Sequence, residues 1–174
     1  MNTTRLNLPS SSSKKQAENK LLWNHLRDQE KADFFTIGYT GRKLEDIIKT
    51  LLMVGVRSLL DIRQNPVSMY RPELSKSNFK IALEKRGIHY FHIPALGVPR
   101  DIRAKAISHG SRNVIWDWYD QYVASPYLGR NLHHFFNSVE HPVALMCVEL
   151  DPHECHRHRL CMALEEMGLR GYDL

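Results

Sequence analysis

A cluster of chemically reactive side chains stands between positions 147 and 157. It combines two thiols, a carboxylate, an imidazole and a guanidinium, which belong to Cys147, Glu149, Cys155, His156 and Arg157. The apolar run 143–148 before it predicts a short buried strand, and the apolar spacing after it predicts a helix. The first backbone N–H groups of a helix have no partner within the helix, so such a junction suits anion binding and catalysis. We therefore expect a functional site here.

The elements that position this cluster follow an alternating pattern of apolar strands and amphipathic helices. Expected strands cover 34–38, 57–63, 89–94 and 143–148. Expected helices follow each strand, with a long Gly-, Pro- and Arg-rich loop at 95–113 and one helical region from Trp116 to Phe136. This alternation predicts an α/β fold in three layers, a mainly parallel sheet with helices on both faces.

Four polar segments follow the four expected strands. They are 38–42, 61–66, 94–97 and 149–157. Because functional groups of parallel sheets gather beyond the carboxyl ends of the strands, we expect these segments to share one edge. The sequence thus predicts a single strand-end cleft that contains both Asp61 and His156.

The same segments carry a family resemblance. The quoted motifs are Thr36-Ile-Gly-Tyr-Thr, Asp61-Ile-Arg with Pro66, Cys147-Val-Glu-Leu-Asp-Pro and Cys155-His-Arg. In order and spacing they resemble the domain of unknown function numbered 488, over about residues 34–174. The resemblance implies a compact α/β domain with these motifs clustered, and it implies no particular reaction. This chain has Tyr39 where histidine is common in the family.

The arginines and carboxylates expected in the cleft could have either of two roles. Arg63, Arg71 and Arg157 are suited to hold an anion such as phosphate through charge-assisted, partly bidentate hydrogen bonds. Asp61, Glu149 and Asp151 then orient them or act as acid, base or magnesium ligands. The alternative is an internal ion-pair network of Asp61, Arg63, Glu149 and Arg157 that only ties the strand ends together.

The cysteines and histidines allow thiol or metal chemistry as well. A cysteine at a helix N-terminus beside a cationic group can act as a nucleophile, but neither Cys147 nor Cys155 has an arginine six residues later, as phosphatases and sulfurtransferases require. Five possible metal ligands, Cys147, His153, Cys155, His156 and His158, lie within twelve residues. Their spacing departs from the paired pattern of structural zinc sites. We therefore assign no metal ligand and place Cys155 and His156, with Asp61 and Glu149, among the catalytic candidates.

Charge and cysteine content limit the setting in which this site works. The chain has 174 residues, three cysteines and a net charge of +5. Residues 61–112 contain ten Lys/Arg and four Asp/Glu, a balance that suits a phosphate-bearing partner, although solvated surface charge is the alternative. An odd cysteine count and a polar N-terminus predict a reducing cytoplasm. No apolar stretch is long enough to span a membrane.

We predict a flexible basic tail with a short capping helix at 1–32 and one α/β domain at 33–174. The predicted function is that of a cytoplasmic enzyme acting on a phosphate-bearing substrate, a nucleotide or nucleic acid, at the strand-end cleft. One alternative is a non-catalytic nucleic-acid or protein-binding module that uses the tail and the basic residues of 100–112. Another is a metal or redox thiol protein in which Cys147 and Cys155 form a pair. No cofactor or oligomeric state follows from the sequence.

Overall fold

The computed structural model describes residues 28–29, 31–124 and 126–174. By its internal contacts the chain divides into two units, Met1–Lys31 and Ala32–Leu174. The tail and capping helix expected at 1–32 lie almost wholly outside the described residues. The fold is therefore that of the second unit.

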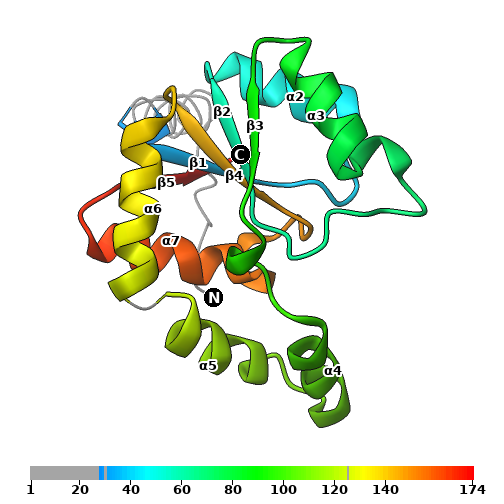
Figure 1. The fold of residues 1–174 in the computed structure, drawn as a ribbon, viewed down its shortest axis with the longest axis vertical. Coiled ribbons are helices and arrows are strands. Elements are labelled where there is room, and N and C mark those ends of the chain that lie inside the picture. The colour runs from blue at the N-terminus through cyan, green and yellow to red at the C-terminus, as the bar shows by residue number, and fades with distance from the viewer. Residues whose placement is uncertain (1–27, 30, 125) are drawn as a thin grey trace, which may run out of the picture. The chain divides into compact units, whose positions relative to one another are not determined.

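Five parallel strands form the centre of this unit, in the spatial order β3-β2-β4-β1-β5 (Figure 1). Their bounds are β1 Phe34–Gly38, β2 Ser58–Asp61, β3 His89–His92, β4 Val143–Cys147 and β5 Gly171–Asp173. The sheet confirms the predicted α/β class, and it is parallel throughout. The fifth strand was not expected from the sequence, since only three residues form it and two of them are half-buried.

Six helices surround the sheet in the part of the chain that the structure describes. They are α2 Leu44–Met53, α3 Lys76–Glu84, α4 Arg100–His109, α5 Asn113–Tyr122, α6 Pro126–Ser138 and α7 His156–Glu166. Apolar residues of α2 and α3 pack on one face of the sheet, and those of α5, α6 and α7 pack on the other (Figure 1). This arrangement gives the three predicted layers. None of the described helices combines the length and apolar character needed to cross a membrane.

The central strand β4 shows why the helices must cover both faces. All five of its residues are buried. Val143, Leu145 and Cys147 pack with α5, α6 and α7, whereas Ala144 and Met146 pack with α2 and α3. A strand with two buried faces reads as a continuous apolar run, so the sequence run predicted this strand correctly.

Two helical segments differ from the expectation. The region 95–113, predicted to be a loop, contains α4, which begins after Pro99 and ends at Gly110 with a left-handed φ of 62°. The sequence shows no apolar periodicity for this helix, because Ala106 is the buried residue among its ten. The expected single helical region is divided into α5 and α6, and α6 begins at Pro126. Proline lacks the N–H that continues a helix and is favoured in a first turn.

We expect Leu145→Ala to lower the free energy of unfolding by about 2–5 kcal/mol, because it leaves a cavity in the buried centre of the sheet. Urea unfolding measures this loss. The control is Leu52→Ala, since Leu52 on α2 is 42% exposed and should cost less than about 1 kcal/mol. Equal losses at the two positions would contradict the assignment of Leu145 to the core.

Candidate functional site

Two thiols and an imidazole meet where β4 ends and α7 begins. Cys147 is the last residue of β4, Cys155 is the N-cap of α7, and His156 is its first residue. One ligand atom from each lies within 4.8 Å of the others. Glu149 joins the group, with its Oε2 3.8 Å from the Cys147 Sγ. Because Cys147 and Cys155 are 1% exposed and His156 is 8% exposed, the cluster is nearly free of water.

The loop between the two cysteines is folded back by its own polar contacts. Asp151 caps the short 3-10 helix Pro152–Glu154, because its Oδ1 accepts a 2.9 Å hydrogen bond from the His153 backbone N–H. The Cys155 Sγ then accepts the Arg157 backbone N–H at 3.5 Å. These turns return the chain to the end of β4, so residues eight positions apart become neighbours.

Arg157 holds this loop from inside. Its side chain is fully buried, and it donates hydrogen bonds to the backbone oxygens of Glu149 and Leu150, the latter at 2.8 Å. It also pairs with Asp173 of β5 at 3.2 Å. Thr36 of β1 donates to the same Asp173 carboxylate. One guanidinium thus ties the loop after β4 to β5 and, through Asp173, to β1.

Gly38 lies against the same loop. A Cβ at this position would overlap the backbone oxygen of Glu149 and reach the Arg157 guanidinium. The end of β1 can therefore approach the loop only where position 38 has no side chain.

The cluster favours one negative charge on Cys155. Burial opposes this charge, but hydrogen bonds from Cys147 and His156, with the attraction of His156 and a further hydrogen bond from Glu149, hold the pKa of the Cys155 thiol well below its usual range. Burial and the neighbouring Cys155 raise the pKa of Cys147. The same two causes raise the pKa of Glu149. The arrangement therefore favours a negative charge on Cys155 over one on Cys147 or Glu149.

A second polar group lies at the end of β2. Asp61 is fully buried and accepts hydrogen bonds from Arg63, at 2.5 Å, and from the Tyr90 hydroxyl, at 2.6 Å. Arg63 also donates to the Leu74 backbone oxygen at 3.0 Å. Burial, together with the Asp61 carboxylate, raises the pKa of Tyr90, so Tyr90 remains a neutral donor. Every polar partner of this group comes from the protein.

The predicted catalytic residues therefore form two groups at one edge. Glu149, Cys155 and His156 come together on the side of α5 and α7, while Asp61 packs with Tyr90 on the side of α2 and α3. The groups approach through Ile62, whose backbone oxygen lies 3.4 Å from the His156 Nε2. Asp61 and His156 share the edge, as expected, but their side chains point to opposite faces of the sheet.

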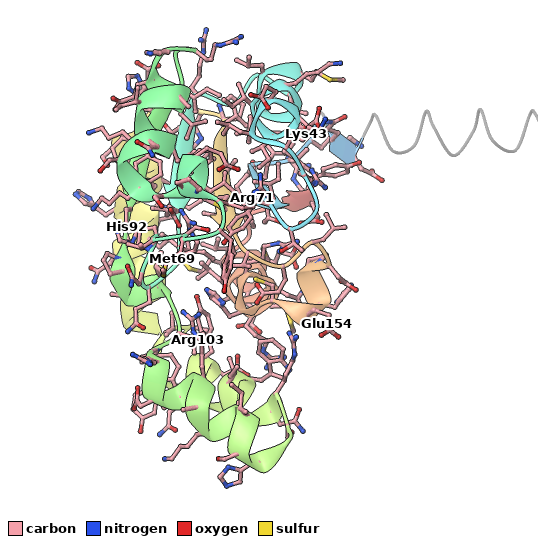
Figure 2. All side chains as sticks on the ribbon, turned by 90° about the vertical axis from the view of Figure 1, so that its right-hand side faces the viewer. Lys43, Met69, Arg71, His92, Arg103 and Glu154 are labelled. Carbon is pink, nitrogen blue, oxygen red and sulfur yellow. The ribbon has the colours of Figure 1, made fainter. Side chains whose placement is uncertain are left out.

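The three predicted anion-binding arginines also differ in placement. Arg63 is 4% exposed and Arg157 is fully buried, and both direct their donors at protein acceptors. This arrangement matches the internal network that the sequence left open as an alternative. Arg71 is partly exposed and lines an open hollow of about 620 Å³ together with Lys43, and Figure 2 shows the two side chains near each other.

Tyr39 connects these groups. Its ring lies under the guanidinium of Arg63 at 5.3 Å and that of Arg71 at 5.9 Å, which are distances typical of cation–π contacts. Its backbone oxygen accepts from Arg71 at 3.3 Å, and its N–H donates to Val148 at 3.2 Å. The loops after β1, β2 and β4 therefore form one continuous surface.

Four participants were not among the predicted site residues. Cys147 had been recognised as a possible ligand, but its place in a buried strand favoured an apolar role. Tyr39 and Tyr90 resemble ordinary core or surface aromatics in sequence. Asp173 lies in a short final strand without a recognisable pattern. For Tyr90, the available signal was its position in the strand expected next along the chain after the Asp61 strand.

The chain belongs to the family described as Domain of unknown function DUF488, whose profile matches residues 43–164. This result confirms the resemblance seen in the strand-end motifs. A search of curated proteins and a search of solved structures each found no match.

We expect Arg157→Lys to destabilise the fold by about 2–4 kcal/mol, because lysine cannot replace the planar set of donors and leaves buried acceptors without partners. Urea unfolding measures the effect. Arg170→Lys is the matched control, since Arg170 is 63% exposed in its pair with Asp33 and should change stability by less than about 0.5 kcal/mol. An unaltered Arg157→Lys protein would contradict the central role given to this side chain.

The depressed pKa of Cys155 makes stability depend on pH. A thiol with a lower pKa in the folded chain stabilises the fold fully above its unfolded pKa, about 8.5, and this contribution is lost as pH falls toward the folded value. The difference in unfolding free energy between the wild type and Cys155→Ser should therefore grow from about pH 5 to about pH 8. Urea unfolding with reductant and chelator present measures it.

Cys161→Ser is the control for this titration. Burial raises the pKa of Cys161 to about 12, so this thiol stays neutral across the range and its difference from the wild type should stay constant. A constant difference for Cys155→Ser as well would show that Cys155 is a neutral thiol.

Proposed function

We propose that the domain is an enzyme that acts on a phosphate-bearing substrate, a nucleotide or nucleic acid, at the carboxyl edge of its sheet. The observation that carries this proposal is an open cationic hollow beside the loop after β1, a loop that is hydrogen-bonded to the loop that carries the buried thiol, imidazole and carboxylate cluster. The hollow supplies a place to hold an anion, and the cluster supplies groups that can exchange protons or donate electron pairs.

Three cationic side chains that are at least partly exposed line the hollow, and two of them also have protein partners: Arg71 pairs with Glu73, and Arg42 donates to the Leu174 backbone oxygen at 2.6 Å. Arg42, Lys43 and Arg71 line it, together with the carboxylates Glu45 and Glu73. Glu73 lies 2.9 Å from Arg71 and so orients it. Lys43 is the N-cap of α2 and provides no side-chain cap. The first N–H groups of that helix thus face the hollow together with the cations, a combination suited to phosphate.

The hollow and the cluster are joined by hydrogen-bonded backbone. Thr40 donates to the Val148 backbone oxygen through its N–H at 3.0 Å and its hydroxyl at 2.7 Å. Val148 lies between Cys147 and Glu149 in the chain. In this proposal, a substrate whose phosphate lies beside Arg71 extends from the loop after β1 toward the loop that carries Glu149.

Arg63 and Arg157 have a different role in this proposal. Their donors are directed at Asp61, Leu74, Leu150 and Asp173, so they position the loops that carry the substrate-facing groups. In this proposal Arg71 binds the anion, as expected from the sequence. Arg42 and Lys43 have the anion-binding role that was first expected for Arg63 and Arg157.

The competing function is that of a non-catalytic nucleic-acid-binding module. The observation that favours it is the exposed basic side chains of α4. Arg100 and Lys105 are exposed on this helix. Two other basic residues of the segment are engaged, since Arg103 donates to the Val98 backbone oxygen and Arg112 pairs with Glu154 at 3.2 Å. The module therefore depends on Arg100 and Lys105, and binding that weakens steeply with salt is its signature.

We expect Arg71→Ala to weaken binding of ADP at least about tenfold, because one charge-assisted contact to phosphate is lost. Isothermal titration calorimetry at fixed salt measures the affinity. Lys80→Ala is the control, as Lys80 lies outside the hollow and is paired with Glu84. It should bind as the wild type does.

Arg100→Ala separates the two functions. An enzyme that uses the hollow keeps its affinity for ADP in this variant, whereas a module that uses α4 loses affinity for a single-stranded oligonucleotide. Loss at Arg100 with no loss at Arg71 would reject the enzyme in favour of the module.

A further inference from the structure

The cluster of Cys147, Cys155 and His156 has the composition of a metal centre. Two thiols and an imidazole are the donors preferred by zinc and by other borderline-soft divalent ions, whereas magnesium and calcium prefer oxygen. Each residue contributes one donor atom, and the three atoms lie within 4.8 Å of one another. The donors come from the end of β4 and the start of α7, which are both held by the surrounding fold.

The spacing of the donors suits one ion. In a tetrahedral zinc site with bonds of about 2.3 Å to sulfur and 2.0 Å to nitrogen, a sulfur and a nitrogen ligand lie roughly 3.5 Å apart. The Cys147 Sγ lies 3.8 Å from the His156 Nδ1 and 3.7 Å from its Nε2. These distances are close to the coordination value, and because the sulfur is almost equally far from both nitrogens, the ring must also rotate about its Cβ–Cγ bond to direct one nitrogen at a shared ion.

The histidine ring lies between the Cys147 sulfur and the Ile62 backbone. Its Nε2 lies 3.4 Å from the Ile62 backbone oxygen, which can accept the ring N–H, and both ring nitrogens lie at nearly the same distance from the Cys147 Sγ. The ring also packs at 5.1 Å from the ring of Tyr119, whose hydroxyl is fixed by the Leu96 oxygen at 2.8 Å. Histidine ligands usually donate their other N–H in this way.

Glu149 provides for the remaining position. Its Oε2 is 3.8 Å from the Cys147 Sγ, close to the roughly 3.5 Å expected between neighbouring sulfur and oxygen donors on one ion. Arg157 fixes the Glu149 backbone. Glu149 is partly exposed, so its carboxylate, or a water molecule held by it, can occupy the fourth position.

We propose that Cys147, Cys155 and His156 bind one divalent ion of the zinc class, with the fourth position at Glu149. The proposal rests on the proposed function only for its purpose, since a metal at this position would act on a substrate held in the hollow. Catalytic zinc sites have three protein ligands and one exchangeable position, and this set follows that pattern. The remaining possibility is a pair of metal-free structural cysteines.

Cobalt binding tests the site directly. The full chain, freed of metal and kept reduced, is titrated with Co²⁺, and the visible and near-ultraviolet spectra are recorded. We expect one Co²⁺ per chain, with the strong visible bands of tetrahedral cobalt and a thiolate charge-transfer band, and displacement of both by Zn²⁺. Absence of these bands at micromolar protein with excess metal would overturn the proposal.

Single substitutions identify the ligands. Cys147→Ser, Cys155→Ser and His156→Ala should each weaken Co²⁺ binding on the order of 100-fold. Cys161→Ser and His158→Ala are matched controls, because these residues lie outside the donor set, and both should retain the wild-type spectrum. Retention of the spectrum in Cys155→Ser, or its loss in Cys161→Ser, would also overturn the assignment.

X-ray absorption of the zinc-loaded wild type covers the case of a variant that does not fold. Two sulfur neighbours at about 2.3 Å are expected, with nitrogen or oxygen completing the shell; a shell without sulfur rejects the site. The ADP titration of Arg71→Ala is independent of this result. If the protein binds metal and Arg71→Ala has unaltered ADP affinity, the proposed function alone is rejected. If the protein binds no metal and Arg71→Ala loses ADP affinity, the metal site alone is rejected.

Discussion

The buried guanidinium of Arg157 is the constraint from which the arrangement of this domain follows. A charge that is fully withdrawn from water must have its donors satisfied, and here the acceptors are the backbone of the loop after β4 and the carboxylate of Asp173. Meeting that requirement fixes the loop, the last strand and the start of α7 relative to one another. The proximity of Cys147 and Cys155 is a consequence of this local geometry.

The sheet divides its polar residues between its two faces. Asp61, Arg63 and Tyr90 form a closed group whose hydrogen bonds are made within the protein. On the other face, two sulfur atoms, an imidazole and the Glu149 carboxyl group contact one another. One layer of backbone separates the two polar groups, and Ile62 is their point of contact.

The sequence predicted the layered α/β fold because β4 and the helices that cover it carry clear apolar periods. It missed α4, which buries little, and β5, which is too short to show alternation. Within the site, convergence of the strand ends was predictable, since parallel strands place their carboxyl ends together. The sequence did not predict which arginine is exposed to water. Arg63, Arg71 and Arg157 are the same residue type and differ only in the tertiary acceptors that they contact.

The order of the strands carries a further consequence for how the domain reaches this state. β1 has no partner among its neighbours in sequence, since it pairs with β4 and β5. The hydrogen bond from Thr36 to Asp173 closes a separation of 137 residues. Loops of this size cost chain entropy before any contact compensates for it, so topologies of this kind fold slowly. The strand β1 can therefore pair with its neighbouring strands only after the second half of the chain has reached it.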